Sequence, residues 1–276
     1  MSMDIVSCNG YNIYMTQTNK INNYLIFTDL DGTLLDHESY SFNAANEMLT
    51  FIKTNNIPLI IVTSKTKEEV LEIQKKLGIN YPFIIENGAG VFIPKDDSFE
   101  LIALGKLYEE TVSFFQKYLL CNEIKGFHQM DEKEVSQLTG LSLEKATLAK
   151  KRTFSEPFIC NDTQKLQTIQ EDLKKNSFDI VKGGRFYHLI SLGQDKANAM
   201  DVVKSYYEKL NDKTYQTIAL GDGENDLTML SAADQAVLIK KFDNSYVTCN
   251  INDVIKTKFI GPKGWNESLK RYFDVK

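Results

Sequence analysis

Short apolar segments alternate with amphipathic ones along the chain from Tyr24 onward. The amphipathic stretches carry apolar residues three and four positions apart, as Val70, Ile73 and Leu77 do, and they predict helices. The apolar segments predict strands at residues 24–29, 58–63, 82–86, 216–221 and 235–239, with a sixth near 256–260. Strands that alternate with helices are typical of an α/β fold in which crossover helices join the strands of a parallel sheet.

A long segment, residues 90–192, interrupts this pattern. It has its own predicted strands at 158–159, 179–181 and 186–190 and its own helices. About a hundred residues between the third and fourth core strands are enough for a second domain. We therefore predict a core of residues 23–89 and 193–276 with an inserted domain at 90–192. Residues 1–22 are polar, rich in Asn and without periodicity, which predicts a disordered or loosely packed tail.

The charge balance gives no reason to expect a nucleic acid or a membrane as partner. Lys and Arg number 32 against 37 Asp and Glu, for a net charge of −5, so an anionic ligand must bind in a local basic pocket. No apolar run approaches the roughly 20 residues that cross a bilayer, and the N-terminus lacks a signal-peptide pattern, so we expect a cytoplasmic protein. Widely spaced cysteines indicate neither a zinc site nor a disulfide framework: Cys8, Cys121, Cys160 and Cys249.

Acidic residues follow two of the predicted strands. The segment 29–33 contains Asp29 and Asp31, and the segment 221–226 contains Asp222 and Asp226. An isolated Asp-x-Asp-Gly sequence would equally indicate a β-turn. However, ligands of an open parallel sheet bind beyond the carboxyl ends of the strands, where the acids converge if the first and fourth core strands are neighbours. Paired carboxylates there can share a divalent cation while one attacks phosphorus and the other moves a proton.

Two more polar motifs lie between these acids along the chain. Thr63 and Ser64 follow the second strand, and Lys196 opens a helix. Alone, Ser64 would be interpreted as a helix N-cap and Lys196 as a solvated lysine. The order acid, hydroxyl, lysine, acid instead predicts one site for phosphoryl transfer.

This ordered set resembles the haloacid dehalogenase-like phosphohydrolases, with their four motifs at 29–33, Ser64, Lys196 and 221–226. Other segments resemble the mannosyl-3-phosphoglycerate phosphatase family more narrowly, and the likeness covers nearly the whole chain after about residue 23. These segments are 63–66, 86–89, 139–141, 152–158, 183–188 and 261–265. Glu224 and Thr228 depart from the proline expected there in many members, which alters the stiffness of the loop and not its charges.

The resemblance implies a Rossmann-like core, an inserted α+β cap and a Mg²⁺-dependent phosphatase. It implies that mannosyl-3-phosphoglycerate is hydrolysed to mannosylglycerate, a compatible solute, through an aspartyl-phosphate on Asp29. Asp31 would be the acid and base, and Ser64 (or Thr63) and Lys196 would bind the phosphoryl oxygens. The implied metal ligands are Asp29, Asp31 through its main-chain carbonyl, and Asp222, with Asn225 and Asp226 in supporting roles.

Cap residues are expected to select the substrate, a small phosphorylated sugar–glycerate that also carries a carboxylate. Arg152, Arg185 and Lys65 are the candidates for binding that carboxylate. Candidates for binding hydroxyls or approaching the ligand closely are Ser155, Glu156, Gly184 and His188. Structural alternatives are a solvated charge run at 150–152, a hairpin turn at 183–184 and a structural role for His188.

Several functional alternatives stay open at this stage. Glucosyl-3-phosphoglycerate or another sugar phosphate could be the substrate, and no residue predicts the oligomeric state. A phosphomutase would also be phosphorylated on Asp29 but would release little free phosphate. A non-catalytic sensor of phosphorylated ligands is a further alternative, against which Asp31 argues, because binding alone needs no proton-transfer group.

Overall fold

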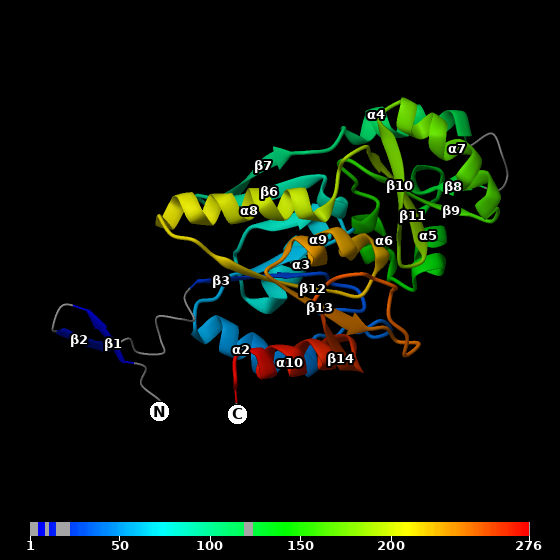
Figure 1. Cartoon of the computed structure of the whole chain (residues 1–276). Coiled ribbons are helices and arrows are strands. Elements are labelled where there is room, and N and C mark those ends of the chain that lie inside the picture. The colour runs from blue at the N-terminus through cyan, green and yellow to red at the C-terminus, as the bar shows by residue number, and fades with distance from the viewer. Residues whose placement is uncertain (1–4, 9–10, 15–22, 119–123, 276) are drawn as a thin grey trace.

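The computed structural model describes residues 5–8, 11–14, 23–118 and 124–275. Its core is an eight-stranded sheet in the order β14-β13-β12-β3-β4-β5-β6-β7 (Figure 1). All six predicted core strands are present within two residues of their expected bounds, and they are mutually parallel. They are β3 (Tyr24–Thr28), β4 (Leu59–Val62), β5 (Phe83–Ile85), β12 (Gln216–Gly221), β13 (Gln235–Lys240) and β14 (Ile255–Ile260). The predicted α/β fold is confirmed.

Helices cover both faces of this sheet, and each face has its own apolar cluster. One face packs against α2 (Asn46–Thr54), α3 (Lys67–Leu77) and α10 (Gly261–Tyr272). The other packs against α8 (Lys196–Asn211) and α9 (Leu227–Ala232), which lie above β12 and β13 in Figure 1. Because the central strands β3, β4 and β5 are buried on both sides, their sequences are almost continuously apolar rather than alternating.

The first and fourth core strands are neighbours, as the site prediction requires. β3 pairs with β12 in parallel, so that Phe27 faces Ala219 and Thr28 faces Leu220. From β3 the chain continues to β4 and β5 on one side, and it later returns to β12 and β13 on the other. The carboxyl ends of β3 and β12 thus lie at the switch point of the sheet, where α/β proteins bind ligands.

The inserted segment begins later than predicted. β6 (Gly90–Lys95) pairs antiparallel with β5, and β7 (Ser98–Ala103) pairs antiparallel with β6, so both extend the core sheet. The assignment of residues 90–103 to the cap was therefore wrong. Their apolar pattern predicts strands, but it does not specify which sheet those strands join.

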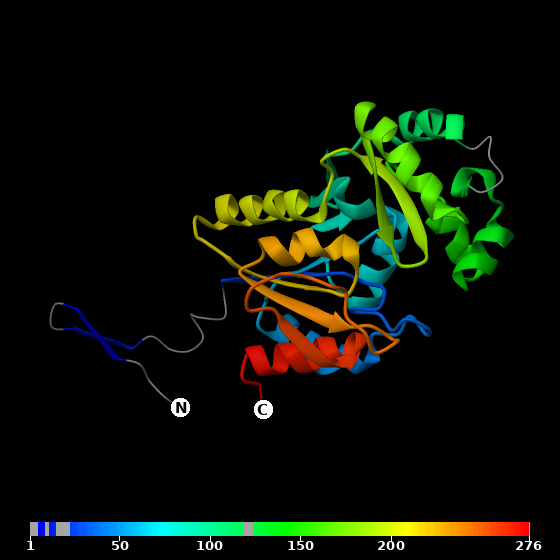
Figure 2. The same ribbon diagram turned by 45° about the vertical axis from the view of Figure 1, so that its right-hand side comes forward.

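Residues 104–192 contain the cap, which rises at one end of the core (Figures 1 and 2). Its antiparallel sheet has the order β10-β11-β9-β8 and its own apolar cluster. The strands are β8 (Ile124–Gly126), β9 (Glu156–Cys160), β10 (Phe178–Gly183) and β11 (Phe186–Ser191). The helices are α4 (Tyr108–Phe115), α5 (Glu132–Thr139), α6 (Leu143–Ala149) and α7 (Thr163–Lys175). The fold of this segment is therefore α+β.

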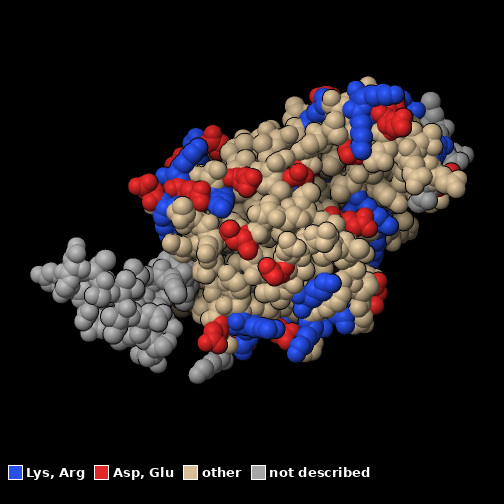
Figure 3. Space-filling view, in the orientation of Figure 1, with Lys and Arg blue, Asp and Glu red and all other residues tan. Residues whose placement is uncertain are grey.

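Short 3₁₀ helices occupy several connections: η1 (Asn43–Ala45), η2 (Glu86–Gly88), η3 (Gln116–Tyr118), η4 (Phe127–Gln129) and η5 (Glu224–Asp226). Near the N-terminus, β1 (Ile5–Cys8) and β2 (Tyr11–Tyr14) form a separate two-stranded antiparallel sheet. The rest of the predicted tail up to residue 22 lies outside the described residues. On the face shown in Figure 3, acidic and basic side chains are interspersed. Within the described ranges, every helix is too short or too polar to cross a membrane.

Candidate active site

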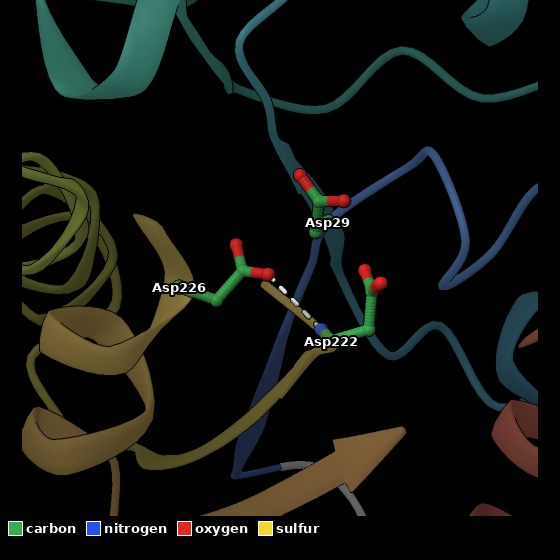
Figure 4. A group of neighbouring side chains, drawn as sticks. All are labelled: Asp29, Asp222 and Asp226. Atoms are coloured by element: carbon green, nitrogen blue, oxygen red, sulfur yellow. Dashed lines mark hydrogen bonds between the residues drawn. The ribbon is translucent and has the colours of Figure 1, made fainter. Parts of the chain in front are cut away.

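Three acidic side chains converge at the carboxyl ends of β3 and β12. Asp29 follows β3, Asp222 follows β12, and Asp226 ends η5. One carboxylate oxygen from each lies within 4.8 Å of the others (Figure 4). Residues separated by almost two hundred positions therefore form one cluster, as the adjacency of the two strands requires.

Lys196 connects two of these carboxylates. Its Nζ donates to Oδ1 of Asp29 (2.7 Å), to Oδ1 of Asp226 (2.6 Å) and to the carbonyl of Val62 (3.1 Å). The side chain is 1% exposed although it belongs to the first residue of α8. The alternative of a solvated lysine was wrong. Burial alone would lower the pKa of Lys196, but Asp226 and Asp29 outweigh that effect and raise it, so the ammonium group stays charged.

The loop after β12 is held by Asp226. Its Oδ2 accepts hydrogen bonds from the main-chain N–H groups of Asp222 (3.0 Å) and Gly223 (2.8 Å). Asp222 also accepts a hydrogen bond from the hydroxyl of Thr33 (3.1 Å). At Gly32, with φ of +78°, a Cβ atom would lie 2.9 Å from the carboxylate of Asp222. The glycine in the first motif thus leaves room for the acid in the fourth.

The three clustered carboxylates carry more negative charge than the neighbouring Lys196 neutralises. Burial and the nearby Asp226 raise the pKa of Asp222 to about 7. Burial also raises the pKa of Asp29, and the negative charges of Asp226 and Asp222 raise it further. The positive charge of Lys196 offsets only part of this rise. A divalent cation is the group that would relieve this repulsion, and carboxylate oxygens are the ligands that Mg²⁺ prefers. The arrangement therefore fits a metal site.

Asp31 and Lys65 form an ion pair beside the cluster. The ammonium of Lys65 lies 2.7 Å from Oδ2 of Asp31 and 3.7 Å from a carboxylate oxygen of Glu69. Oδ1 of Asp31 is buried and has no hydrogen-bond partner within the described ranges. Since native proteins rarely leave such an atom unpaired, it is available for a group of the ligand.

A pocket extends from this cluster to the cap. Predicted residues that line it are Asp29, Asp31, Ser64, Lys65, Arg152, Gly184, Arg185, His188, Asp222 and Asn225. Thr63 is 1% exposed, and its hydroxyl accepts a hydrogen bond from the N–H of Lys65 (3.2 Å). Thr66, not Ser64, caps α3, so the N-cap alternative for Ser64 was wrong. Of the two hydroxyl residues, Ser64 is the one at the pocket.

The two arginines differ in how firmly they are held. Arg152 is almost fully buried, and its guanidinium contacts Glu86, Ser155 and the carbonyl of Ser64. The alternative of a solvated charge run was therefore wrong for Arg152. Arg185 is exposed and donates from Nη1 to the carbonyl of Thr139 (3.1 Å).

Two predicted ligand-binding residues lie elsewhere. Ser155 and Glu156 are fully buried and do not line the pocket. The carboxylate of Glu156 accepts hydrogen bonds from the hydroxyl of Tyr108 (2.6 Å) and the N–H of His128 (2.9 Å) inside the cap. Their assignment to substrate binding was therefore wrong, because the sequence at the start of a strand does not show which side chains face the pocket.

His188 lines the pocket as an uncharged ring. Burial, Arg152 and Lys196 lower its pKa to about 3. Its Nδ1 is buried without a hydrogen-bond partner in the described parts of the chain. A neutral imidazole suits a hydroxyl group better than an anion, because it carries no charge and offers one donor and one acceptor.

Aromatic residues that we did not predict also line the pocket. His37 and Phe242 stack with ring centroids 4.0 Å apart, and Tyr40, Phe127 and Phe186 are further members of the lining. They come from loops, from the start of β11 and from the short helix η4, where no spacing pattern distinguishes them from residues of the apolar core. Asn225 belongs to the lining as well, and its amide donates to Oδ1 of Asn87 (3.0 Å).

The comparisons with known proteins identify the class to which this fold and site belong. A family model described as haloacid dehalogenase-like hydrolase matches residues 26–249. The chain belongs to this family of hydrolases.

Two curated relatives indicate a narrower family within these hydrolases. The glucosyl-3-phosphoglycerate/mannosyl-3-phosphoglycerate phosphatase of Persephonella marina is 46% identical over 258 residues, which are 90% of this chain and 96% of the relative. A phosphatase of the same name from Methanococcoides burtonii is 37% identical over 262 residues, with 89% and 96% covered. These relatives confirm the narrower family resemblance and the prediction of a phosphoric monoester hydrolase.

Solved structures support the fold. A Thermoplasma acidophilum protein has a TM-score of 0.69 at 20% identity and covers 92% of this chain and 100% of its own. The sucrose-phosphatase of Synechocystis has a TM-score of 0.62 at 13% identity, with 92% and 98% covered. The alignments span core and cap together.

Replacing Gly88 tests how closely the core packs against the start of α8. A Cβ atom at Gly88 would lie 2.1 Å from the carbonyl oxygen of Asp195 and 3.0 Å from the N–H nitrogen of Lys196, at a φ of +93°. We expect Gly88→Ala to lower the free energy of unfolding by about 1–3 kcal/mol through overpacking, and to lower activity by displacing Lys196. Denaturant unfolding and phosphate release measure the two effects.

Gly140→Ala is the matched control for backbone strain. Gly140 has a similar φ of +77° but no atom within 4 Å of its Cβ position. It should share the cost of the left-handed conformation and keep its activity. Equal losses of activity in both variants would contradict the steric explanation.

Proposed function

We propose that this enzyme removes the phosphate from glucosyl-3-phosphoglycerate or mannosyl-3-phosphoglycerate in a Mg²⁺-dependent reaction. The supporting observation is one pocket that is lined by two of the clustered acids, Asp29 and Asp222, and by the basic groups of Arg152 and Arg185. The buried Lys196 pairs with Asp29. The acid–lysine part suits a phosphoryl group and the arginine part a carboxylate. The names of the curated relatives point to the same substrate class.

In this mechanism Asp29 attacks the phosphorus. The P–O bond to glycerate breaks, Asp31 gives its proton to the departing oxygen, and phosphate stays on Asp29 as an acyl phosphate. Asp31 then takes a proton from a water molecule, which attacks phosphorus and releases inorganic phosphate and Asp29. Lys196 favours the ionised form of Asp29 through their 2.7 Å contact, and Ser64 binds the phosphoryl oxygens.

Asp29, Asp222 and the carbonyl of Asp31 would hold Mg²⁺. The bound ion would neutralise negative charge on the phosphoryl oxygens and on the acids that surround it. Asp226 has both oxygens engaged, one by Lys196 and one by the main chain at 222–223. We therefore assign it to holding Lys196 and the loop rather than to binding the ion directly.

The raised pKa of Asp222 predicts a pH-dependent stability for the metal-free protein. Its ordinary value is 3.8 and its folded value is about 7, so the folded state binds more protons than the unfolded state between these limits. The contribution of this group to stability is therefore complete below pH about 4 and is lost as pH rises to about 7. We expect the Tm of the metal-free protein to fall across this window.

Mg²⁺ should reverse this trend, because it binds the ionised acids of the folded state. We expect the rise in Tm on adding Mg²⁺ to be larger at pH 8 than at pH 5. Thermal unfolding of the wild type and of Asp222→Asn, with Mg²⁺ or with a chelator, measures both effects. A Mg²⁺ effect of equal size in the two proteins, or a wild-type effect independent of pH, would argue against the proposed site.

Phosphate release from a panel of substrates tests the proposed function. We expect the two phosphorylated sugar–glycerates to give the highest kcat/KM, ahead of hexose phosphates and p-nitrophenyl phosphate. A strong preference for a hexose phosphate would refute the substrate assignment. Product analysis separates the phosphomutase alternative, which would give a phosphorylated isomer and little free phosphate, and binding without turnover would indicate a sensor.

Arg185→Ala should impair the carboxylated substrates selectively. We expect their kcat/KM to fall by about 10-fold, the cost of one exposed charge-assisted contact, while p-nitrophenyl phosphate changes little. Lys182→Ala is a control on the same β-hairpin, since Lys182 does not line the pocket. Equal losses on both kinds of substrate would reject the role assigned to Arg185.

A further inference from the structure

Glu86 lies where three segments of the site meet, and its side chain has no part in the reaction above. It follows β5 and is fully buried. Its N–H donates to the carbonyl of Lys65 (3.1 Å), and its own carbonyl accepts from Nε2 of Gln194 (2.7 Å). The main chain of Glu86 thereby connects the segment that carries Ser64 with the segment that leads to Lys196.

The carboxylate of Glu86 binds the cap. Oε1 accepts from the N–H of Thr153 (2.7 Å), and Oε2 accepts from the N–H groups of Phe154 (3.2 Å) and Ser155 (2.7 Å). The ring of Phe154 is buried in the apolar cluster of the core sheet, not in that of the cap. Residues 152–155, here called the plug segment, therefore belong to the cap but are seated in the core.

The same carboxylate holds Arg152. Its Nη2 lies 3.2 Å from Oε2 of Glu86 and donates to the hydroxyl of Ser155 (2.7 Å) and the carbonyl of Ser64 (3.1 Å). Its Nε donates to the carbonyl of Ser155 (3.2 Å). These contacts fix the plane of the guanidinium. They leave Nη1, which has no partner within the described residues, for the ligand in the pocket.

The backbone around Glu86 is strained as well. Glu86 and Asn87 have φ of +49° and +59°, and Gly88 follows with +93°. Non-glycine residues hold such conformations only where their surroundings compel them to, and these positions are concentrated at functional sites. Here the compelling contacts are the hydrogen bonds to the plug segment and to Gln194.

We infer that Glu86 is a positioning residue that orients Arg152 so that Nη1 meets the carboxylate of the substrate. One oxygen of Glu86, Oε2, binds both Arg152 and the main chain of the plug segment. Glu86 therefore orients Arg152 when the plug segment is seated in the core. The inference rests on the proposed function, since it requires a substrate with a carboxylate. A phosphate ester without that group should react independently of the Glu86 side chain.

A double-mutant cycle on Glu86 and Arg152 tests this inference. The readout is the ratio of kcat/KM for glucosyl-3-phosphoglycerate to kcat/KM for p-nitrophenyl phosphate. We expect Glu86→Gln to lower the ratio about 10-fold through KM and Arg152→Ala to lower it about 30–100-fold, as charge-assisted contacts do. The double variant should match Arg152→Ala, because Glu86 acts through that residue.

Two further variants keep the test decisive. Ser155→Ala removes only the hydroxyl between Glu86 and Arg152 and should give a smaller change in the same direction, even if Glu86→Gln folds poorly. Asp234→Asn removes a carboxylate that binds Thr217 near the opposite end of β12 and should leave the ratio unchanged.

The outcomes separate the inference from the proposed function. Equal effects of Glu86→Gln on both substrates, or independent effects in the double variant, would overturn the positioning role alone. A wild-type enzyme without preference for the carboxylated substrate would overturn the proposed function and this inference with it. An unchanged ratio in Arg152→Ala would overturn the carboxylate contact on which Glu86 is inferred to act.

Discussion

Asp29→Asn is expected to lower the rate of phosphate release by at least about 10⁴-fold, as loss of a catalytic nucleophile does in other enzymes. The amide nitrogen and oxygen occupy nearly the same space as the carboxylate, so the pocket should keep its shape. What is lost is the oxygen that attacks phosphorus and a strong acceptor for Lys196 (2.7 Å). Steady-state kinetics with every substrate of the panel should show the same loss, because all of them share this step.

The same substitution should not destabilise the metal-free protein. Burial raises the pKa of Asp29, with Asp226 and Asp222 adding to the rise, so ionising this side chain is unfavourable in the folded state. Removing its charge relieves that repulsion and offsets the weaker contact with Lys196. We expect the Tm with a chelator present to stay the same or to increase, a common trade between stability and activity at active sites.

Asp234→Asn provides the control for this prediction as well, because its carboxylate lies at the far end of the sheet. It should lose some stability and keep its turnover. Intact-mass measurement of the Asp29→Asn protein is needed to show that the amide has not hydrolysed back to the acid. Near-normal turnover by verified Asp29→Asn protein would exclude the covalent mechanism.

Lys196→Met is expected to damage both activity and stability. The lysine is buried and contacts two carboxylates at 2.6–2.7 Å. Methionine fills a similar volume, but it leaves Asp29 and Asp226 without their counter-charge. Removing one partner of a buried ion pair typically costs about 3–5 kcal/mol. Denaturant unfolding should show a loss of this size.

The catalytic loss has a separate cause. Without the ammonium group, the pKa of Asp29 rises further and the side chain is protonated, so that it cannot attack. We expect kcat to fall by about 10³-fold, the upper range for a single preorganised electrostatic contact. Because deprotonation restores the nucleophile, the remaining activity should increase with pH more steeply than in the wild type.

Lys204→Met on the same helix is the matched control. Lys204 is partly exposed and lies 4.0 Å from its partner, Asp234. A surface pair of this kind contributes at most about 1 kcal/mol, so this variant should be close to the wild type in stability and rate. If Lys196→Met resembled Lys204→Met, the central role of the buried lysine would be excluded.

The central part of the site was predictable because its residues follow directly from strand ends. Continuous apolar runs predict β3 and β12, and the order of the motifs along the chain predicts that Asp29, Asp222 and Lys196 lie together. The general rule for parallel sheets supplied the rest. Local sequence patterns are sufficient to predict such residues when the strands form a regular parallel sheet.

The errors concern pairings between distant segments. The apolar residues of β6 were assigned to the cap because a strand pattern does not name its partner strand, and here that partner was β5. Ser155 and Glu156 were assigned to the ligand, although both carboxylates and hydroxyls also serve as buried structural groups. No role was predicted for the side chain of Glu86, because its five donors come from residues more than sixty positions away.

The seating of Phe154 in the core limits how this protein could be re-engineered. The two connections of the inserted segment lie together, since the N–H of Lys106 donates to the hydroxyl of Ser191 (2.7 Å). That closeness would make residues 107–190 easy to excise or to exchange for those of another phosphatase. A chimaera made in this way would, however, leave an apolar hole beside Gly90 and an unpaired buried charge on Glu86. A successful graft must therefore supply its own aromatic residue and arginine at these positions.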